Sequence, residues 1–213
     1  MKKFIIVDDH PLYRKGVSLL IEQRLGLECV GESSTVAEAT DMIAKTLPYL
    51  AIIDISLQNG SGLDLVSSAR TSWPALKILV LSMHDENLYG ERAVRSGAKG
   101  YVMKHETPER LIDAITDVLA GRLAISDNLR NRLVENISSG LRSSIDPRIA
   151  LTNRELEIFS LIGKGYGASD IATRLNLSVK TINAHQDRMK NRLGLLTAGE
   201  LRRLAFDWIA GNI

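Results

Sequence analysis

Short apolar segments alternate with amphipathic helical patterns through the first 120 residues, and this alternation limits the fold more than any other feature of the chain. Segments of this kind are typical of strands that are buried on both faces of a parallel sheet. The predicted strands are Phe4–Val7, Leu50–Ile53, Ile78–Leu81 and Gly100–Met103, with a weaker one at Glu28–Gly31. The predicted helices between them are Tyr13–Leu25, Val36–Thr46, Leu63–Ser72, Leu88–Ser96 and a last one that runs from Pro108, capped by Thr107, to about Ala120.

Five strands that alternate with five helices predict a doubly wound α/β domain, a flavodoxin-like five-stranded parallel sheet over residues 1–121. No strand-like segment follows, and residues 150–213 are predicted to form an all-α domain of four helices, at about 153–163, 168–175, 179–192 and 198–210. Residues 122–149 hold a possible short helix and then the serine-rich segments 138–140 and 143–144, so we assign them to a linker.

The charge of the chain differs between these two parts. Residues 1–120 carry 13 Lys and Arg against 16 Asp and Glu, a net charge of −3, whereas residues 121–213 carry 14 against 9, a net charge of +5. A basic second part is what a domain that binds a polyanion would have. The single cysteine, Cys29, excludes an internal disulfide and a thiolate metal cluster. No apolar segment approaches the roughly 20 residues of a membrane helix or resembles a signal peptide, so we expect a cytoplasmic protein with no membrane partner.

Polar residues follow four of the predicted strands at the points where those strands end. Asp8 and Asp9 follow the first strand in the chain, Asp54 the third, Ser82 the fourth and Lys104 the fifth. Because parallel strands place their carboxyl ends at one edge of the sheet, these side chains should converge there. Crowded carboxylates favour a hard divalent cation such as Mg²⁺. Lys104 adds a cation that a metal-only site would not need but a transferred phosphoryl group would.

Four sequence motifs in this part resemble the response-regulator receiver family. They are V-D-D-H-P at 7–11, I-I-D-I-S at 52–56, L-S-M-H at 81–84 and G-A-K-G-Y-V-M-K at 97–104. The resemblance implies that Asp54 is the phosphoacceptor and attacks phosphorus as a nucleophile. It also implies that Asp9, Asp54 and the backbone carbonyl of Ser56 hold Mg²⁺, with Asp8 assisting.

The same resemblance assigns roles to the residues that would respond to phosphorylation. Lys104 would pair with the phosphoryl oxygens, Ser82 would donate its hydroxyl and move inward, and Tyr101 would swing with it as an aromatic switch. Ser56 and His84 occupy the positions that tune how fast the phosphoryl group is lost in this family. The modification adds about −1.5 to −2 charges and shifts a two-state equilibrium at the surface of the fourth strand, the helix after it and the fifth strand.

The helical part contains two short helices, Ala168–Leu175 and Val179–Arg192, joined by a tight connection. Ser178 is a suitable N-cap for the second helix, and Leu175, Leu177 and Ile182 are placed to pack the pair together. The second helix is rich in Lys and Arg, which is typical of a recognition helix in the major groove of DNA.

Residues 151–194 resemble the NarL/FixJ (LuxR-type) DNA-binding domain, including L-T-N-R-E at 151–155 and T-I-N-A-H at 181–185. The resemblance implies a set of residues at or near the DNA: Lys180, Thr181, Asn183, Ala184, Asp187 and Arg188. Asn183 could pair with an adenine edge. Asp187 either accepts from a cytosine amino group or is unfavourable near phosphates, and both interpretations stay open. His185 is interpreted as a packing residue and not as a metal ligand.

The final predicted helix carries an apolar stripe at helical spacing, made of Leu201, Leu204, Ala205, Trp208 and Ile209. Two interpretations remain open for it. The stripe covers the core of its own domain, or part of it forms a dimer contact, because domains of this kind bind paired half-sites as dimers.

Together the two resemblances predict a two-component response regulator that is not an enzyme. A sensor histidine kinase would phosphorylate Asp54, and a homodimer would then bind double-stranded promoter DNA. A phosphotransfer enzyme acting on a metabolite is one alternative, but the loops after the strands are short and hold no obvious substrate-binding insertion. The other alternative is a DNA-binding regulator that uses its receiver only for phosphorylation-independent dimerisation, and the intact set of pocket residues argues against it.

Overall fold

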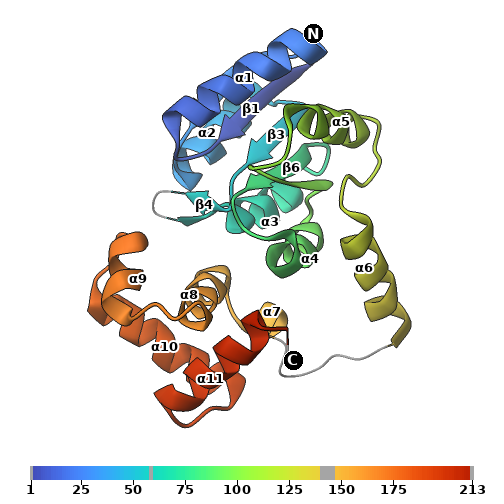
Figure 1. The fold of residues 1–213 in the computed structure, drawn as a ribbon. Helices are drawn as coiled ribbons and strands as arrows, with labels where there is room; N and C mark the ends of the chain where they lie inside the picture. Colours follow the sequence, from blue (N-terminus) through green and yellow to red (C-terminus); the bar gives the residue numbers. More distant parts are fainter. Residues whose placement is uncertain (1, 58–59, 140–146, 212–213) are drawn as a thin grey trace. The chain divides into compact units, whose positions relative to one another are not determined.

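The computed structural model describes residues 2–57, 60–139 and 147–211 (Figure 1). The chain forms two compact units, Met1–Leu141 and Arg142–Ile213, which are described separately below. The division between them falls within residues 122–149, the segment assigned to a linker.

The first unit is built on a five-stranded sheet in the order β2-β1-β3-β6-β7. Its strands are β1 (Lys3–Val7), β2 (Glu28–Ser33), β3 (Leu50–Ile53), β6 (Lys77–Ser82) and β7 (Gly100–Met103). Every neighbouring pair is parallel. The predicted flavodoxin-like sheet is therefore confirmed. A short antiparallel hairpin, β4 (Ser56–Leu57) and β5 (Gly60–Ser61), follows β3 and was not predicted.

Five helices cover the two faces of this sheet (Figure 1). On one face α1 (Pro11–Leu25) contacts α5 (Pro108–Leu119), and on the other α3 (Gly62–Ser72) contacts both α2 (Val36–Thr46) and α4 (Glu86–Ser96). Two helices, α1 and α4, begin two residues earlier than predicted. Pro11 suits the first position of a helix because its ring fixes φ, and the Asp85 side chain caps α4 by accepting from the Asn87 N–H at 2.8 Å.

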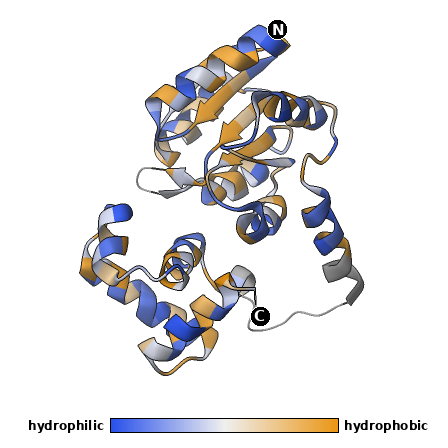
Figure 2. Ribbon diagram, viewed as in Figure 1, coloured by the Kyte–Doolittle hydropathy of each residue, from blue (hydrophilic) through white to orange (hydrophobic). Residues whose placement is uncertain are grey.

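The core lies between the sheet and the helices, and Figure 2 shows the strands as the most apolar part of this unit. The side packed by α1 and α5 contains Phe4, Ile6, Leu50, Ile52, Leu79, Leu81, Val102, Val17, Ile21, Leu111, Ala114, Ile115 and Val118, all buried. Burying one large apolar side chain contributes roughly 1.5–3 kcal/mol to the free energy of unfolding. This cluster therefore stabilises the sheet and holds its carboxyl edge in place.

Residues 122–139 lie on the first unit. After α5 the chain returns to the sheet, where Ala124 pairs with Gly100 in a parallel bridge, and α6 (Asp127–Ser139) then packs against α4. The helix predicted within the linker thus extends into the first serine-rich segment. The second serine-rich segment, 143–144, lies outside the described residues.

The second unit is wholly helical over its described residues. It comprises α7 (Pro147–Ala150), α8 (Asn153–Gly163), α9 (Ala168–Arg174), α10 (Val179–Leu193) and α11 (Ala198–Ile209). The four predicted helices are confirmed, and the single-turn α7 was not predicted. None of the described helices in either unit combines the length and the hydropathy that a bilayer crossing requires.

Helices α8 and α11 approach each other closely at Gly163, where a Cβ atom would lie 2.3 Å from the carbonyl oxygen of Ala205. The rings of Phe159 and Trp208 pack beside this contact, with their centroids 5.4 Å apart. Leu201, Ala205 and Trp208 are buried, whereas Leu204 and Ile209 are half-buried. Part of the apolar stripe of the last helix therefore covers the core of its own unit, and the dimer contact stays a prediction.

Candidate functional site

The carboxyl edge of the sheet brings together the pocket residues that the sequence indicated. Asp8 follows β1, Asp54 follows β3, Ser82 ends β6 and Lys104 follows β7. Asp8 is 2% exposed, Asp54 3% and Ser82 0%. Ionisable groups are seldom buried to this extent unless they are paired, so the pairing of these groups decides what the pocket can do.

Lys104 pairs with two of the carboxylates at once. Its Nζ lies 2.6 Å from Asp54 Oδ2 and 2.7 Å from Asp8 Oδ2, and its side chain is 3% exposed. Burial alone would lower the pKa of Lys104, but the carboxylates of Asp54 and Asp8 raise it above its ordinary value. The ammonium group also lies 4.8 Å from the centre of the Tyr13 ring. Lys104 is therefore a fixed buried cation between the two acids.

The carboxyl group of Asp54 experiences opposing influences. Burial raises its pKa and is the largest of them, while the charge and hydrogen bond of Lys104 lower it. The nearby Asp8 carboxylate raises it further, and a hydrogen bond from Ser82 lowers it, so that the pKa is raised overall. A carboxylate that is poorly solvated and held by one cation is suited to nucleophilic attack on a group that brings its own counter-ion.

The pocket offers a donor set for a hard divalent cation. Asp8, Asp9, His10 and Asp54 each present a ligand atom, and these atoms all lie within 4.8 Å of one another. Asp9 Oδ1 is shielded from solvent, and His10 Nδ1 lies 2.7 Å from it. Carboxylates gathered this closely repel one another unless a cation joins them, and carboxylate oxygens are ligands that Mg²⁺ prefers. The residues present therefore fit Mg²⁺.

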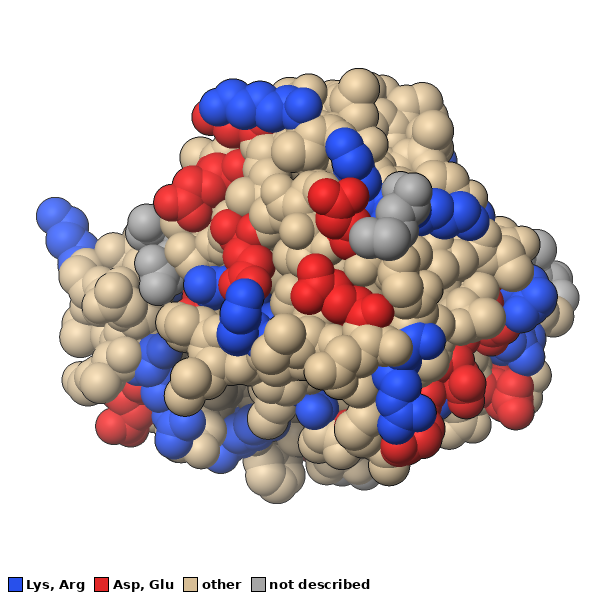
Figure 3. All heavy atoms as spheres, turned by 90° about the horizontal axis from the view of Figure 1, so that it is seen from above, with Lys and Arg blue, Asp and Glu red and all other residues tan. Residues whose placement is uncertain are grey.

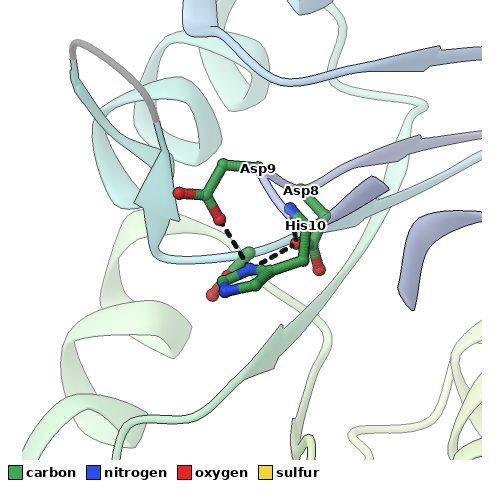
Figure 4. A group of neighbouring side chains, drawn as sticks. Asp8, Asp9 and His10 are labelled. Atoms are coloured by element: carbon green, nitrogen blue, oxygen red, sulfur yellow. Dashed lines mark hydrogen bonds and ion pairs between the residues drawn. The ribbon is translucent and has the colours of Figure 1, made fainter. Parts of the chain in front are cut away.

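His10 is a pocket residue that the sequence analysis did not single out. Its Nδ1 lies 2.7 Å from Asp9 Oδ1 and 3.2 Å from Asp8 Oδ1 (Figure 4). Its backbone N–H also donates to Asp8 Oδ1 at 2.8 Å. The sequence feature that could have identified His10 as a pocket residue is its position directly after the Asp pair. In the structure it is the N-cap residue of α1.

His84 connects the residues assigned to the switch. Its backbone N–H donates to Ser82 Oγ at 3.3 Å, and its carbonyl oxygen accepts from the Tyr101 hydroxyl at 2.7 Å. Its Nε2 lies 2.8 Å from Ser56 Oγ, in the loop that follows Asp54. Tyr101 is 1% exposed, so its ring already points inward. Burial, followed by the charges of its neighbours, raises the pKa of Tyr101 well above its usual value, which keeps the hydroxyl a donor.

In the second unit, α9 and α10 form a helix-turn-helix pair. Ser178 caps α10 by accepting from the Thr181 N–H at 3.0 Å, as predicted. Asn176 supplies the turn with φ of 51°, a left-handed conformation that Asn tolerates better than most residues. Ile182 is fully buried against the pair, and Leu175 and Leu177 are half-buried.

One face of α10 is buried and the opposite face is open. Ile182, Met189 and Leu193 are buried, while the exposed residues include Lys180, Asn183, Ala184, Asp187 and Arg188. Thr181 is half-buried, with its hydroxyl 2.8 Å from that of Ser178. The structure thus places five of the six residues assigned to DNA contact on the exposed face.

Two further residues of α10 have defined surroundings. Asp187 Oδ1 lies 2.9 Å from Lys190 Nζ, so its charge is partly compensated on the helix itself. Burial, followed by the charge of Arg188, lowers the pKa of His185 and favours the neutral imidazole.

The surface charge shows how the two signs are distributed. On the face drawn in Figure 3, acidic and basic side chains are interspersed, and neither sign forms a continuous patch.

A buried acidic pocket with a paired lysine, at the edge of a flavodoxin-like sheet and in one chain with a helix-turn-helix unit, defines the class of response regulators. Residues 4–116 match the family described as response regulator receiver domain. Residues 150–205 match the bacterial regulatory proteins of the luxR family. The chain belongs to the LuxR-type (NarL/FixJ) family of two-component response regulators, which are transcriptional regulators.

Individual relatives agree with this assignment, and two of them match nearly the whole chain. The oxygen regulatory protein NreC of Staphylococcus aureus is 36% identical over 204 residues, which cover 93% of this chain and 94% of that protein. RcsB of Salmonella enterica serovar Typhimurium, solved bound to a promoter in the presence of the phosphomimetic BeF3-, is 27% identical, with a TM-score of 0.61 and coverage of 96% and 98%. A LuxR-family response regulator from Aurantimonas is 33% identical, with a TM-score of 0.58, over 64% of this chain and 97% of that one.

Proposed function

We propose that this protein binds promoter DNA under the control of phosphorylation at Asp54 by a sensor histidine kinase. The observation that carries the proposal is the buried Lys104 ammonium, which bridges Asp54 and Asp8 within hydrogen-bonding distance of both. Such a cation stabilises carboxylates in the resting pocket and is placed to pair with phosphoryl oxygens once they arrive. That RcsB was solved on a promoter with a phosphomimetic present supports the same link between pocket and DNA.

The chemistry follows from the positions of the side chains. A carboxylate oxygen of Asp54 forms a bond to phosphorus, the P–N bond of the donor phosphohistidine breaks, and the imidazole leaves with its electron pair and takes up a proton. Mg²⁺, held by Asp9, Asp54 and the carbonyl of Ser56 with Asp8 assisting, would neutralise charge on the phosphoryl group as it transfers. Lys104 then exchanges its bond to Asp54 for one to a phosphoryl oxygen.

The switch residues respond to the new acceptor oxygens. Ser82 turns its hydroxyl toward the phosphoryl group and gives up the N–H of His84, which it accepts in the resting pocket. Tyr101 is already buried and bonded to His84, so phosphorylation would stabilise its inward position and not create it. The phosphorylated receiver then favours a homodimer in which each α10 enters the major groove at one half-site.

Other parts of the proposal concern organisation and location. We assign the receiver to residues 1–121, the linker to 122–149 and the DNA-binding domain to 150–213. As a regulator that acts at promoters, the protein would work in the cytoplasm and would turn over no metabolite.

DNA binding by the full chain tests the proposal. Affinity for promoter DNA is expected to rise by about tenfold when beryllium fluoride is added together with Mg²⁺, because a coupling of that size is typical between two linked sites. Mg²⁺ alone and the Asp54→Ala variant with both additions are the controls. Equal affinity in all three samples would instead favour a receiver that serves phosphorylation-independent dimerisation.

The exposed cations of α10 give a separate prediction. Lys180→Ala or Arg188→Ala should weaken binding to every DNA sequence and reduce the slope of log affinity against log salt by about one counterion, because each removes one phosphate contact. Arg203→Ala, which removes an exposed arginine from α11, is the matched control. Fluorescence anisotropy at several salt concentrations measures both quantities. Unchanged affinity and slope in both α10 variants would remove this helix from the DNA.

A further inference from the structure

The segment that leaves the receiver is attached to β7 by backbone hydrogen bonds. The Ala124 N–H donates to the carbonyl of Lys99 at 2.9 Å, and the Tyr101 N–H donates to the carbonyl of Ala124 at 2.8 Å. Ala124 is buried and packs on Gly100, where an added Cβ would lie 3.1 Å from the Ala124 Cβ. The segment thus pairs with the strand that carries Tyr101 and ends just before Lys104.

The first turns of α6 are attached to the start of α4. The Ser126 N–H donates to Glu86 Oε1 at 3.0 Å, and this carboxylate is buried. Arg132 Nη1 donates to the carbonyl of Asn87 at 3.1 Å. Leu129 is fully buried and occupies the space above Gly90, where a Cβ would lie 2.5 Å from Leu129 Cδ2. We call these contacts of residues 124–132 with α4 and β7 the linker clamp.

Both partners of the linker clamp connect directly to the pocket. The Tyr101 hydroxyl binds the carbonyl of His84, and the ring of His84 packs on that of Tyr89 in α4, with the centroids 4.6 Å apart. His84 also holds Ser82 Oγ through its backbone N–H. The residues of α4 that bind α6 lie in the first turns after this loop. Glu86 and Asn87 are therefore the residues of α4 that lie nearest along the chain to the loop of Ser82 and His84.

We propose that the linker clamp is the element that reads the state of the receiver: it is closed in the unphosphorylated protein, and phosphorylation of Asp54 loosens it. This inference rests on the proposed function and names the contacts through which phosphorylation would affect the linker. Drawing the loop of Ser82 and His84 toward the phosphoryl group pulls the start of α4 away from Ser126 and Arg132. Release of α6 then frees additional chain between the receiver and the DNA-binding domain, which favours the paired geometry that a dimer on DNA needs.

Hydrogen exchange of residues 124–132 in the full chain tests this inference. With beryllium fluoride and Mg²⁺, exchange in this segment should become faster by on the order of tenfold, whereas the strands of the sheet stay protected. Binding of beryllium fluoride is established in the same samples by fluorine NMR or by mass spectrometry of the folded protein. Failure to bind it would overturn the proposed function and the inference together. Binding with unchanged or slower exchange in 124–132 would overturn the inference alone.

Two substitutions open the linker clamp without touching the pocket. Leu129→Ala removes the buried anchor, and Gly90→Ala places a methyl group in its space while favouring the helical conformation of α4. Both should speed exchange in 124–132 in the unmodified protein and reduce the further change caused by beryllium fluoride. Val134→Ala, at an exposed position of the same helix, is the matched control. Wild-type exchange in both variants would show that α6 is not held by this contact.

DNA affinity shows whether the linker clamp transmits the phosphorylation state of the receiver or is only a structural contact. In Leu129→Ala the ratio between affinities with and without beryllium fluoride should fall toward one, because the clamp is already open. A ratio equal to that of the wild type, in a variant whose exchange shows an open clamp, would overturn the inference.

Discussion

Replacing Asp54 with Asn is expected to abolish uptake of a phosphoryl group from a small phosphodonor in the presence of Mg²⁺. The amide is close in shape to the carboxylate, but it lacks the charge and the nucleophilic oxygen that attack phosphorus. Lys104 keeps its second partner, Asp8, at 2.7 Å, so the pocket remains paired. Intact mass spectrometry of the wild type and the variant, incubated side by side, measures the gain.

The matched control is Asp41→Asn, which neutralises an exposed carboxylate on α2, outside the pocket. It should take up one phosphoryl group as the wild type does. A gain of equal size in Asp54→Asn would place the acceptor elsewhere. Absence of a gain in the wild type, in a sample that binds beryllium fluoride, would indicate rapid loss of the phosphoryl group.

Replacing Lys104 with Met is expected to lower the free energy of unfolding by about 3 kcal/mol near neutral pH, because it leaves two buried carboxylates without their shared cation. The variant should also fail to respond to beryllium fluoride, since the phosphoryl oxygens lose their partner. Urea unfolding followed by circular dichroism measures the stability. Lys99→Met, which removes an exposed lysine just before β7, should change it little.

The loss of stability caused by Lys104→Met should depend on pH, and the pKa of Asp54 sets the direction of that dependence. Burial already raises the pKa of Asp54, and removing Lys104 removes the largest influence that lowers it. A carboxyl group whose pKa is raised on folding favours the folded state below its unfolded pKa of about 3.9 and loses that contribution as the pH rises through the folded value. The difference between Lys104→Met and wild type should therefore be smallest in acid and grow toward neutral pH. Mg²⁺ should restore part of it by binding only the folded state. A difference that is independent of pH would contradict this account.

The sequence predicted the sheet well because its strands are buried on both faces and leave uninterrupted apolar segments. It also predicted that Asp8, Asp54 and Lys104 would meet, since the ends of parallel strands share one edge. The hairpin β4–β5 and helix α7 were missed, because strands of two residues and a helix of four are too short to show a period.

Contacts between loops could not be predicted in the same way. The bond between Ser56 and His84 joins residues 28 positions apart, and that between Ser126 and Glu86 joins residues 40 apart. Both depend on how two connections bend once the sheet has formed, and no local pattern encodes that. The same holds for the inward position of Tyr101, which follows from the carbonyl that its hydroxyl reaches.

The turn at Asn176 has a consequence for how proteins built like this one diversify. Its left-handed backbone, together with buried Ile182 and Met189, fixes how α10 leaves the turn, and none of these three residues lies on the exposed face of that helix. Exposed residues such as Asn183 and Arg188 do not take part in setting the direction of α10. They are therefore free to change one at a time, and under the proposed function a duplicated copy could acquire a new operator while its fold and its response to phosphorylation stay intact.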